Sequence, residues 1–279
     1  MSLYGVIHSA RGIVDWPFVR PSRLKWERKR FLSPRSNGAY FGVYESFASA
    51  RTALPASPGF NHEAIAREYI ETRTERAFEY DYPVMLWLEK AFRAGAKSVL
   101  DIGGSVGVHY YAYRPYLDMP ADLSWDIVEV PIIASFGREL AAERGALPFS
   151  FTSDLNEAIG AGRHDVWISA GAIQYFEDAH PAKLLSHCAQ RPAHLLLNKL
   201  PLHDGDDFVT TQNLGYGAFS PVHVYNRTRF IRSIQELGYT PLDTWDVHER
   251  LMYVPGHHEC SFDKFTGVYF LDRTKGQSQ

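Results

Sequence analysis

The sequence has 279 residues, enough for one α/β domain of roughly 180–200 residues and an appendage. Hydrophobic residues make up 45% of the chain and charged residues 22%, a composition that excludes a disordered polypeptide. The net charge of −3 at pH 7 argues against a nucleic-acid-binding protein, because such proteins usually carry a basic excess.

The lack of a recognisable targeting signal and the small number of cysteines point to a reducing compartment. No apolar run approaches the ~20 residues that span a bilayer, and the first residues contain no long apolar segment of the kind that leads a secreted protein. Two cysteines, Cys188 and Cys260, cannot form a disulfide framework, so each is expected to be a small hydrophobic residue. Together these features predict a cytoplasmic protein.

Residues 1–60 are expected to form an irregular arm that is rich in basic and aromatic residues. Eight Lys and Arg residues lie within 11–35 and are interleaved with Trp16, Phe18 and Trp26. Such an arm could contact an anionic membrane surface or an anionic substrate. The alternative, which we favour, is a solvated arm whose aromatic side chains pack on the main domain.

Residues 61–96 predict a helical lead-in or lid. Asn61 is a good N-cap for a first helix. Pro83 suits the first turn of a second helix, and Gly95 ends it. The position of the two helices directly before the main domain suits either role.

Strand and helix signals alternate over 97–279, which indicates crossover helices and a largely parallel sheet. The expected strands are 98–102, 125–130, 147–152, 165–169, 194–198, 241–247 and 265–271. The pattern predicts an α/β, Rossmann-like domain: a mostly parallel seven-stranded sheet with helices on both faces.

The segment 201–225 interrupts this alternation and is expected to be irregular. It follows the fifth strand, and ligands of an open parallel sheet bind beyond the carboxyl ends of the strands. We therefore expect 201–225 to form a cap over the site together with the helices at 61–94. The alternative is a surface loop with no role.

The most informative motif is Val99-Leu-Asp-Ile-Gly-Gly-Ser-Val-Gly107, in which a buried strand ends in a glycine turn before a helix. Gly103, Gly104 and Gly107 would let the backbone approach a cofactor closely, and the helix N-terminus offers N–H groups. Asp101 precedes the turn, where a carboxylate suits a cationic group such as the amino group of an amino acid and would repel a phosphate. A nicotinamide dinucleotide is therefore the weaker alternative.

Glu129 ends the next strand, 22 residues beyond Gly107. At that position an acidic side chain can accept hydrogen bonds from both hydroxyls of a ribose. Taken with Asp101, Glu129 favours a ribose-containing cofactor over the alternative of a surface acid at a strand end.

The glycine turn with Asp101 and the Val-Glu-Val sequence at 128–130 resemble the first two motifs of class I S-adenosylmethionine-dependent methyltransferases. The resemblance covers about 97–273. The segments 42–50 and 230–239 are similar to a little-characterised branch of bacterial methyltransferases, whose members are often thought to modify cell-surface glycans or secondary metabolites. The resemblance implies S-adenosyl-L-methionine as cofactor and a small-molecule, glycan or secondary-metabolite acceptor, with O-methylation favoured.

The resemblance also implies roles for residues that follow the third and fourth strands. Asp154 matches the place of a polar residue near the adenine amino group, and it could equally cap the helix after it. Ser169 and Ala170 end the strand where the family exposes the methyl group. Tyr175 follows them, where it could contact the cofactor or the acceptor.

A hydroxyl acceptor needs a base to remove its proton, whereas a carboxylate acceptor needs none. The candidate bases are His203 and His223, near the two ends of the cap segment, and His109, just inside the cofactor turn. His223 is preferred because Tyr225 nearby could complete an acceptor pocket. The predicted catalytic set is therefore His223, Tyr175 and His203.

Other classes of site and function remain as alternatives. The run 257–260 reads His-His-Glu-Cys, but neighbouring strand residues point to opposite faces, so we expect no metal site there. A nicotinamide-dependent oxidoreductase shares the glycine turn and the strand-end acid. A non-catalytic protein that binds the cofactor would share every motif described above.

Overall fold

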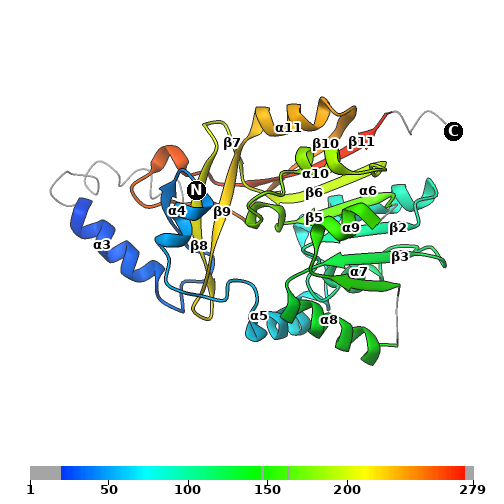
Figure 1. The fold of residues 1–279 in the computed structure, drawn as a ribbon, viewed down its shortest axis with the longest axis horizontal. Helices are drawn as coiled ribbons and strands as arrows, with labels where there is room; N and C mark the ends of the chain where they lie inside the picture. Colours follow the sequence, from blue (N-terminus) through cyan, green and yellow to red (C-terminus); the bar gives the residue numbers. More distant parts are fainter. Residues whose placement is uncertain (1–19, 146–147, 162–163, 274–279) are drawn as a thin grey trace.

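The computed structural model describes residues 20–273 except 146–147 and 162–163, and a seven-stranded sheet lies at its centre (Figure 1). The strand order is β10-β11-β6-β5-β2-β3-β4; β11 runs antiparallel to both of its neighbours, and the other strands are parallel to one another. The strands are β2 (Ser98–Ile102), β3 (Ser124–Val128), β4 (Phe149–Thr152), β5 (Val166–Ala170), β6 (His194–Leu200), β10 (Tyr239–Val247) and β11 (Phe265–Asp272). This topology confirms the predicted Rossmann-like α/β fold.

Helices cover both faces of the sheet because successive side chains of a strand point to opposite faces. Val99 and Leu196 contribute to the core under α6, α7 and α8, whereas Leu100 and Leu195 contribute to the core under α9, α10 and α11. The helices are α6 (Tyr82–Arg93), α7 (Val108–Tyr113), α8 (Pro131–Glu143), α9 (Leu155–Ala161), α10 (Pro181–His187) and α11 (Arg227–Gln235). Among the described residues, no helix combines the length and the apolar character that a membrane span requires.

A second, four-stranded sheet replaces the irregular structure expected at 201–225. Its order is β1-β8-β9-β7, with β1 (Tyr40–Tyr44), β7 (Leu202–His203), β8 (Phe208–Gly215) and β9 (Ala218–Asn226). Tyr216 and Gly217, which join β8 to β9, both have positive φ, as a tight hairpin turn requires. The expectation was wrong because nearly all of β8 is buried, so the strand lacks the apolar–polar alternation that marks a half-exposed strand.

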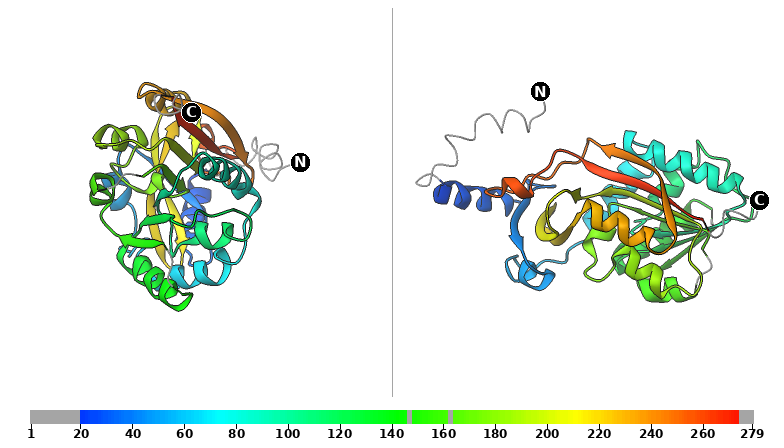
Figure 2. Two further views of the ribbon diagram at one scale, coloured as in Figure 1. Left: turned by 90° about the vertical axis from the view of Figure 1, so that its right-hand side faces the viewer. Right: turned by 90° about the horizontal axis from the view of Figure 1, so that it is seen from above.

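The N-terminal arm is also more regular than expected. It contains α3 (Arg20–Phe31), β1 and α4 (Phe47–Thr52), and Figures 1 and 2 show α3 and the second sheet at one end of the molecule. Phe31 is buried and packs on Phe41 and Phe219, with ring centroids 5.7 and 5.5 Å away. Trp26 stays 58% exposed, so the expected packing does not extend to it. Trp16 and Phe18 lie outside the described residues.

The segment 61–96 is helical as predicted, but it consists of several short pieces. They are α5 (Glu63–Glu68), a π-helical turn η1 (Tyr69–Arg73), a 3-10 turn η2 (Glu79–Asp81) and α6. His62 rather than Asn61 caps α5, since its side chain accepts from Ala64 N at 3.1 Å. Asn61 Oδ1 instead accepts from Ile132 N at 2.9 Å, which ties the lead-in to the first turn of α8.

A first prediction concerns the packing of α6 on the sheet. Leu88 is fully buried in the core on this face, whereas Leu86 on the same helix is 51% exposed. Leu88→Ala should lower the free energy of unfolding by about 2–5 kcal/mol because it removes buried methyl groups and leaves a cavity. Leu86→Ala is the matched control and should change it by less than about 0.5 kcal/mol. Chemical denaturation measures both, and equal effects would contradict this packing.

Candidate functional site

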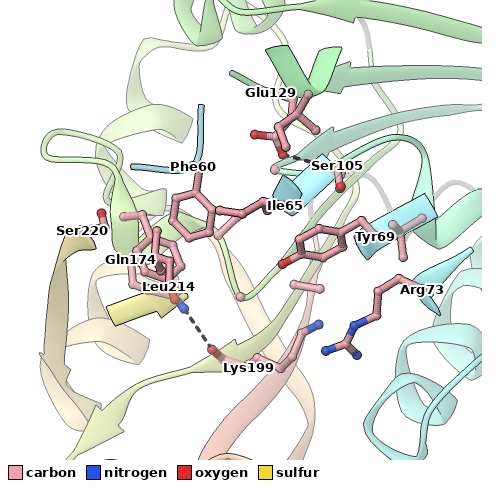
Figure 3. A pocket seen from close by; sticks show the side chains of 18 of the residues that line it. Phe60, Ile65, Tyr69, Arg73, Ser105, Glu129, Gln174, Lys199, Leu214 and Ser220 are labelled. Atoms are coloured by element: carbon pink, nitrogen blue, oxygen red, sulfur yellow. Dashed lines mark hydrogen bonds between the residues drawn. The ribbon is translucent and has the colours of Figure 1, made fainter. Parts of the chain in front are cut away.

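A cavity of about 390 Å³ lies beyond the carboxyl ends of β2, β5 and β6, where the second sheet and the lead-in close over them (Figure 3). Its walls come from four places: the glycine turn after β2, the ends of the neighbouring strands, the lead-in helices, and the second sheet. Ile65 and Tyr69 from the lead-in and Leu214 and Ser220 from the second sheet line it. The segments expected to form a cap are therefore part of the cavity wall.

The glycine turn forms one end of the cavity. Gly103, Gly104 and Ser105 line it, and Gly103 and Ser105 have φ of 73° and 56°, in the left-handed region. A Cβ added to Gly103 would overlap the side chain of Ala172, and one added to Gly104 would lie 2.5 Å from Asp101 Oδ2. Both positions therefore need glycine for packing inside the protein as well as for approach to a ligand.

Gly107 has a different place. It precedes α7 with φ of 95° and is not among the residues that line the cavity. Its N–H donates to Gly104 O at 3.1 Å, which closes the turn. Its role in the structure is to start the helix.

Glu129 lies beside the turn, immediately after β3, and its side chain lines the cavity. Glu129 Oε2 accepts from Ser105 N at 3.1 Å, and Oε1 accepts from Val130 N at 2.9 Å (Figure 3). Burial raises the pKa of Glu129 to about 7, against the lowering effect of these two hydrogen bonds. Glu129 is therefore a largely buried acid at the cavity wall, where its oxygens can accept further hydrogen bonds.

Asp101 lies behind the turn rather than at the cavity surface. Its side chain is fully buried, and its carboxylate bonds His109 Nδ1 at 2.9 Å and Trp125 Nε1 at 3.2 Å. His109 lines the cavity and Asp101 does not. Asp101 thus reaches the cavity through His109, and direct contact of Asp101 with a cofactor stays a prediction that this placement does not support.

The remaining predicted cofactor residues separate into two groups. Ala170 lines the cavity, whereas Ser169 is fully buried and donates to Ile102 O at 3.1 Å. Asp154 is exposed, lies outside the cavity wall, and accepts from Asn156 N and Glu157 N at 2.9 and 3.0 Å. The structure therefore gives Asp154 the role of helix cap, which was one of its two interpretations.

Two of the three predicted catalytic residues lie outside the cavity wall. His223 Nε2 bonds Glu177 O at 3.1 Å and its ring packs on Phe47, while His203 Nε2 bonds Asp206 O at 2.6 Å. Neither position was predictable, because each depends on which face of the second sheet the side chain occupies. Tyr175 does line the cavity, and its hydroxyl donates to Gln212 Oε1 at 2.6 Å.

The cationic side of the cavity was not predicted from the sequence. Arg73 from η1, Lys199 from β6 and Arg250 from the connection between β10 and β11 all line it. The sequence did contain a signal for Lys199, because this residue directly follows the expected fifth strand, 194–198. The loop that carries Arg250 has no such signal, since only the fold brings residue 250 to the ends of the parallel strands.

Lys199 reaches the cavity through a distortion of β6. Its φ is 54°, a left-handed conformation that is costly for a residue with a side chain. The pairing of β6 with β11 shifts register at this point, and Asn198 Oδ1 accepts from Lys199 N at 2.9 Å. Asn198 Nδ2 also donates to Tyr80 O at 2.8 Å, which anchors the distortion to the lead-in.

Two buried polar atoms at the cavity are without a hydrogen-bond partner in the part of the chain that the structure describes. They are Ser105 Oγ and Gln174 Oε1, and both residues line the cavity. A buried polar atom without a partner costs free energy, so such atoms indicate that a ligand completes their hydrogen bonding. Ser105 Oγ lies at the glycine turn. Gln174 Oε1 lies near Lys199, because Gln174 Nε2 donates to Lys199 O at 3.5 Å (Figure 3).

A second prediction concerns the left-handed backbone conformation of Lys199. Lys199→Gly and Lys199→Ala both remove the amine, but only alanine keeps a Cβ in the left-handed conformation. Lys199→Gly should therefore have a free energy of unfolding about 1 kcal/mol higher than that of Lys199→Ala. Chemical denaturation of the two variants measures the difference, and a more stable alanine variant would show that the backbone there is not strained.

No protein-family model matches the chain, and no curated protein matches it. Among solved structures, the chain is similar to the N-terminal domain of EvdMO1 with SAH bound (17% identity, TM-score 0.46, 81% of this chain and 94% of that chain covered). It is also similar to the magnesium protoporphyrin IX methyltransferase of Synechocystis PCC 6803 with bound SAH (13%, 0.48, 76% and 95%). A third is the mitomycin 7-O-methyltransferase MmcR (17%, 0.44, 93% and 69%).

The fold itself can be assigned from the order of its strands. Numbered along the chain within the main sheet, the strands lie in the order 6-7-5-4-1-2-3, and the seventh is antiparallel to the rest. The glycine turn follows the first strand and Glu129 follows the second. The chain therefore has the fold of the class I S-adenosylmethionine-dependent methyltransferases.

Proposed function

We propose that this protein transfers a methyl group from S-adenosylmethionine to a small-molecule, glycan or secondary-metabolite acceptor, with oxygen as the favoured atom. The observation that carries the proposal is the pairing of Ser105 with Glu129. The two residues follow adjacent parallel strands, are joined by a hydrogen bond of 3.1 Å, and both line the cavity. This is the edge of an open α/β sheet where a nucleoside binds.

The residues at this end of the cavity fit the cofactor. The Glu129 carboxyl can accept the two ribose hydroxyls, and Ser105 Oγ has hydrogen-bonding capacity to spare. Val130 and Ile133 offer an apolar wall for an adenine ring. The adenine role of Asp154 stays a prediction, and it would require the side chain to leave the helix cap.

S-adenosylmethionine, when bound, supplies an electrophilic methyl group on a sulfonium sulfur. The protein's part is to orient the acceptor and to exclude water. Phe60 and Tyr175 pack edge to face with centroids 4.6 Å apart, and Leu214 lies with them in the cavity wall. These side chains can enclose the acceptor.

The proposed oxygen acceptor is compatible with two proton arrangements. A carboxylate needs no base. A hydroxyl needs one, and of the histidines considered His109 is the one in the cavity wall. A proton on Nδ1, donated to Asp101, leaves Nε2 as the acceptor nitrogen of the neutral ring.

A third prediction tests cofactor binding at Glu129. Calorimetry should show that the protein binds S-adenosylhomocysteine and that Glu129→Ala weakens this binding at least about tenfold, because charge-assisted hydrogen bonds are lost. Glu143→Ala, at the exposed end of α8, is the matched control and should bind like the wild type.

Two outcomes would point to the other function classes. Binding of NAD without binding of S-adenosylhomocysteine would indicate an oxidoreductase. Binding of S-adenosylhomocysteine without methyl transfer from S-adenosylmethionine across a broad acceptor panel would indicate a non-catalytic binding protein.

A fourth prediction concerns pH. Because the pKa of Glu129 is raised to about 7, its carboxyl is mostly neutral at pH 6 and mostly ionised at pH 8 in the free protein. Ribose hydroxyls donate to the ionised form, so binding favours loss of the proton and tightens as pH rises. The affinity for S-adenosylhomocysteine should increase from pH 6 to pH 8, by at most about tenfold per unit. Glu129→Gln should remove this increase, and an unchanged slope in that variant would assign the proton to another group.

A further inference from the structure

We propose that the methyl acceptor carries a carboxylate or phosphate group, and that Arg250 and Lys199, with tyrosine hydroxyls around them, bind this group. The inference rests on the proposed function, since it names the class of acceptor for the same site. It starts from the charge of the cavity wall opposite Glu129, where three cationic side chains face one enclosed space.

In the part of the chain that the structure describes, the three cations have no carboxylate as an ion-pair partner. Within the described part of the chain, no carboxylate oxygen lies within ion-pairing distance of Arg73, Lys199 or Arg250. Arg73 instead donates to the Tyr80 hydroxyl and packs on the Phe78 ring at 4.6 Å, and Lys199 Nζ lies 4.8 Å from the centroid of the Tyr80 ring. Aromatic rings hold these cations in place without neutralising them.

The cations also lie close enough to affect one another. Burial is the main cause that lowers the pKa of Lys199 to about 8, and repulsion by Arg250 and Arg73 adds to it. Figure 3 shows the ends of the Lys199 and Arg73 side chains pointing toward each other below Tyr69. Like charges brought together in a partly buried space are unfavourable, and an anion between them would relieve the repulsion.

The acidic residues nearby do not cancel this charge. Asp81 and Asp101 both attract Lys199. The oxygens of Asp81 accept from Phe78 N at 2.9 Å and from the Tyr113 hydroxyl at 3.1 Å, and the carboxylate of Asp101 bonds His109 and Trp125. Glu68 accepts from the exposed Tyr216 at 3.1 Å. Glu129 belongs to the opposite end of the cavity. Asp81 and Asp101 already bond other groups, and two carboxylates cannot balance all three cations.

The bound cofactor accounts for one more cation. S-adenosylmethionine has a single carboxylate, and Arg73 is the cation best placed for it, because η1 packs against α7 directly after the glycine turn. Arg250 lies among four tyrosines, Tyr175, Tyr40, Tyr80 and Tyr69. Tyr40 belongs to β1, and the Tyr175 hydroxyl bonds Gln212 of β8, so Arg250 lies next to the second sheet.

Tyrosine hydroxyls complete a set of donors around Arg250. Tyr40, Tyr69, Tyr80 and Tyr175 line the cavity, and burial raises the pKa of each phenol. The Tyr175 hydroxyl already donates to Gln212 Oε1, whereas the hydroxyls of Tyr40, Tyr69 and Tyr80 are protonated at neutral pH and can donate hydrogen bonds to an anion. Guanidinium, ammonium and phenol donors together recognise the oxygens of a carboxylate or a phosphate.

The experiment uses the full chain saturated with S-adenosylhomocysteine, at constant ionic strength. Inorganic phosphate and acetate are titrated in separate arms, and the broadening of their NMR signals reports binding. The wild type should bind at least one of the two, and the tighter arm identifies the anionic group. Arg250→Gln and Lys199→Met should each weaken this binding about tenfold or more. Arg250→Lys, which keeps the charge, should give an intermediate loss.

The control variants are Arg93→Gln and Lys97→Met, whose side chains are 74% and 56% exposed and lie outside the cavity wall. Both should bind the anion like the wild type. Arg250→Gln should keep its affinity for S-adenosylhomocysteine within about threefold, which also shows that the variant is folded.

Three results would overturn the inference. The first is no anion binding by the wild type, and the second is equal binding by the cavity variants and the controls. The third is anion binding by the protein alone that is lost when S-adenosylhomocysteine saturates it, which would assign the cations to the cofactor carboxylate. Failure of the proposed function would look different from failure of this inference, because the protein would then not bind S-adenosylhomocysteine. Anion binding could still be measured on the protein alone.

Discussion

The buried carboxylate of Asp101 is the contact on which the site depends. It lies on β2 and bonds Trp125 of β3 and His109 of α7, so that it joins the first two strands and the first helix of the domain. A fully buried carboxylate is tolerable only when its oxygens are hydrogen-bonded. The same carboxylate packs against Gly104, and it therefore also sets the path of the turn that carries Ser105 toward Glu129.

The second sheet gives the cavity its far wall. β1 comes from the N-terminal arm and pairs with β8, which follows β6 and β7 more than 160 residues later in the chain. Thr211 Oγ1 donates to Phe41 O, and Asn213 Nδ2 donates to Phe31 O. Polar side chains of β8 therefore bind the arm in addition to the backbone pairing of β8 with β1. The cap is thus a folded part of the molecule, which suits a site that must exclude water.

The two ends of the cavity have opposite charge. Glu129 lies at the glycine turn, whereas Arg73, Lys199 and Arg250 form the cationic part of the cavity wall. The backbone distortion at Lys199 contributes to this arrangement, because a regular strand residue would point to a face of the sheet rather than beyond its end. Strain of this kind persists where the surrounding structure holds it, here through Asn198, Tyr80 and Trp245.

The sequence by itself determined the main sheet, the glycine turn after its first strand and the acid that follows its second. The signals for these features are local: apolar runs at 98–102 and 194–198, glycines after the first strand and an acid after the second. Local signals can be recognised without knowledge of the fold. Only the tertiary structure decided the rest of the cavity wall. β8 showed no alternation because nearly all of it is buried, His203 and His223 were placed by the faces of β7 and β9, and Arg250 reaches the cavity from a connection that carries no motif. The physical reason is the same in each case: these side chains are positioned by partners far away in the chain, and a pattern of neighbouring residues contains no information about such partners.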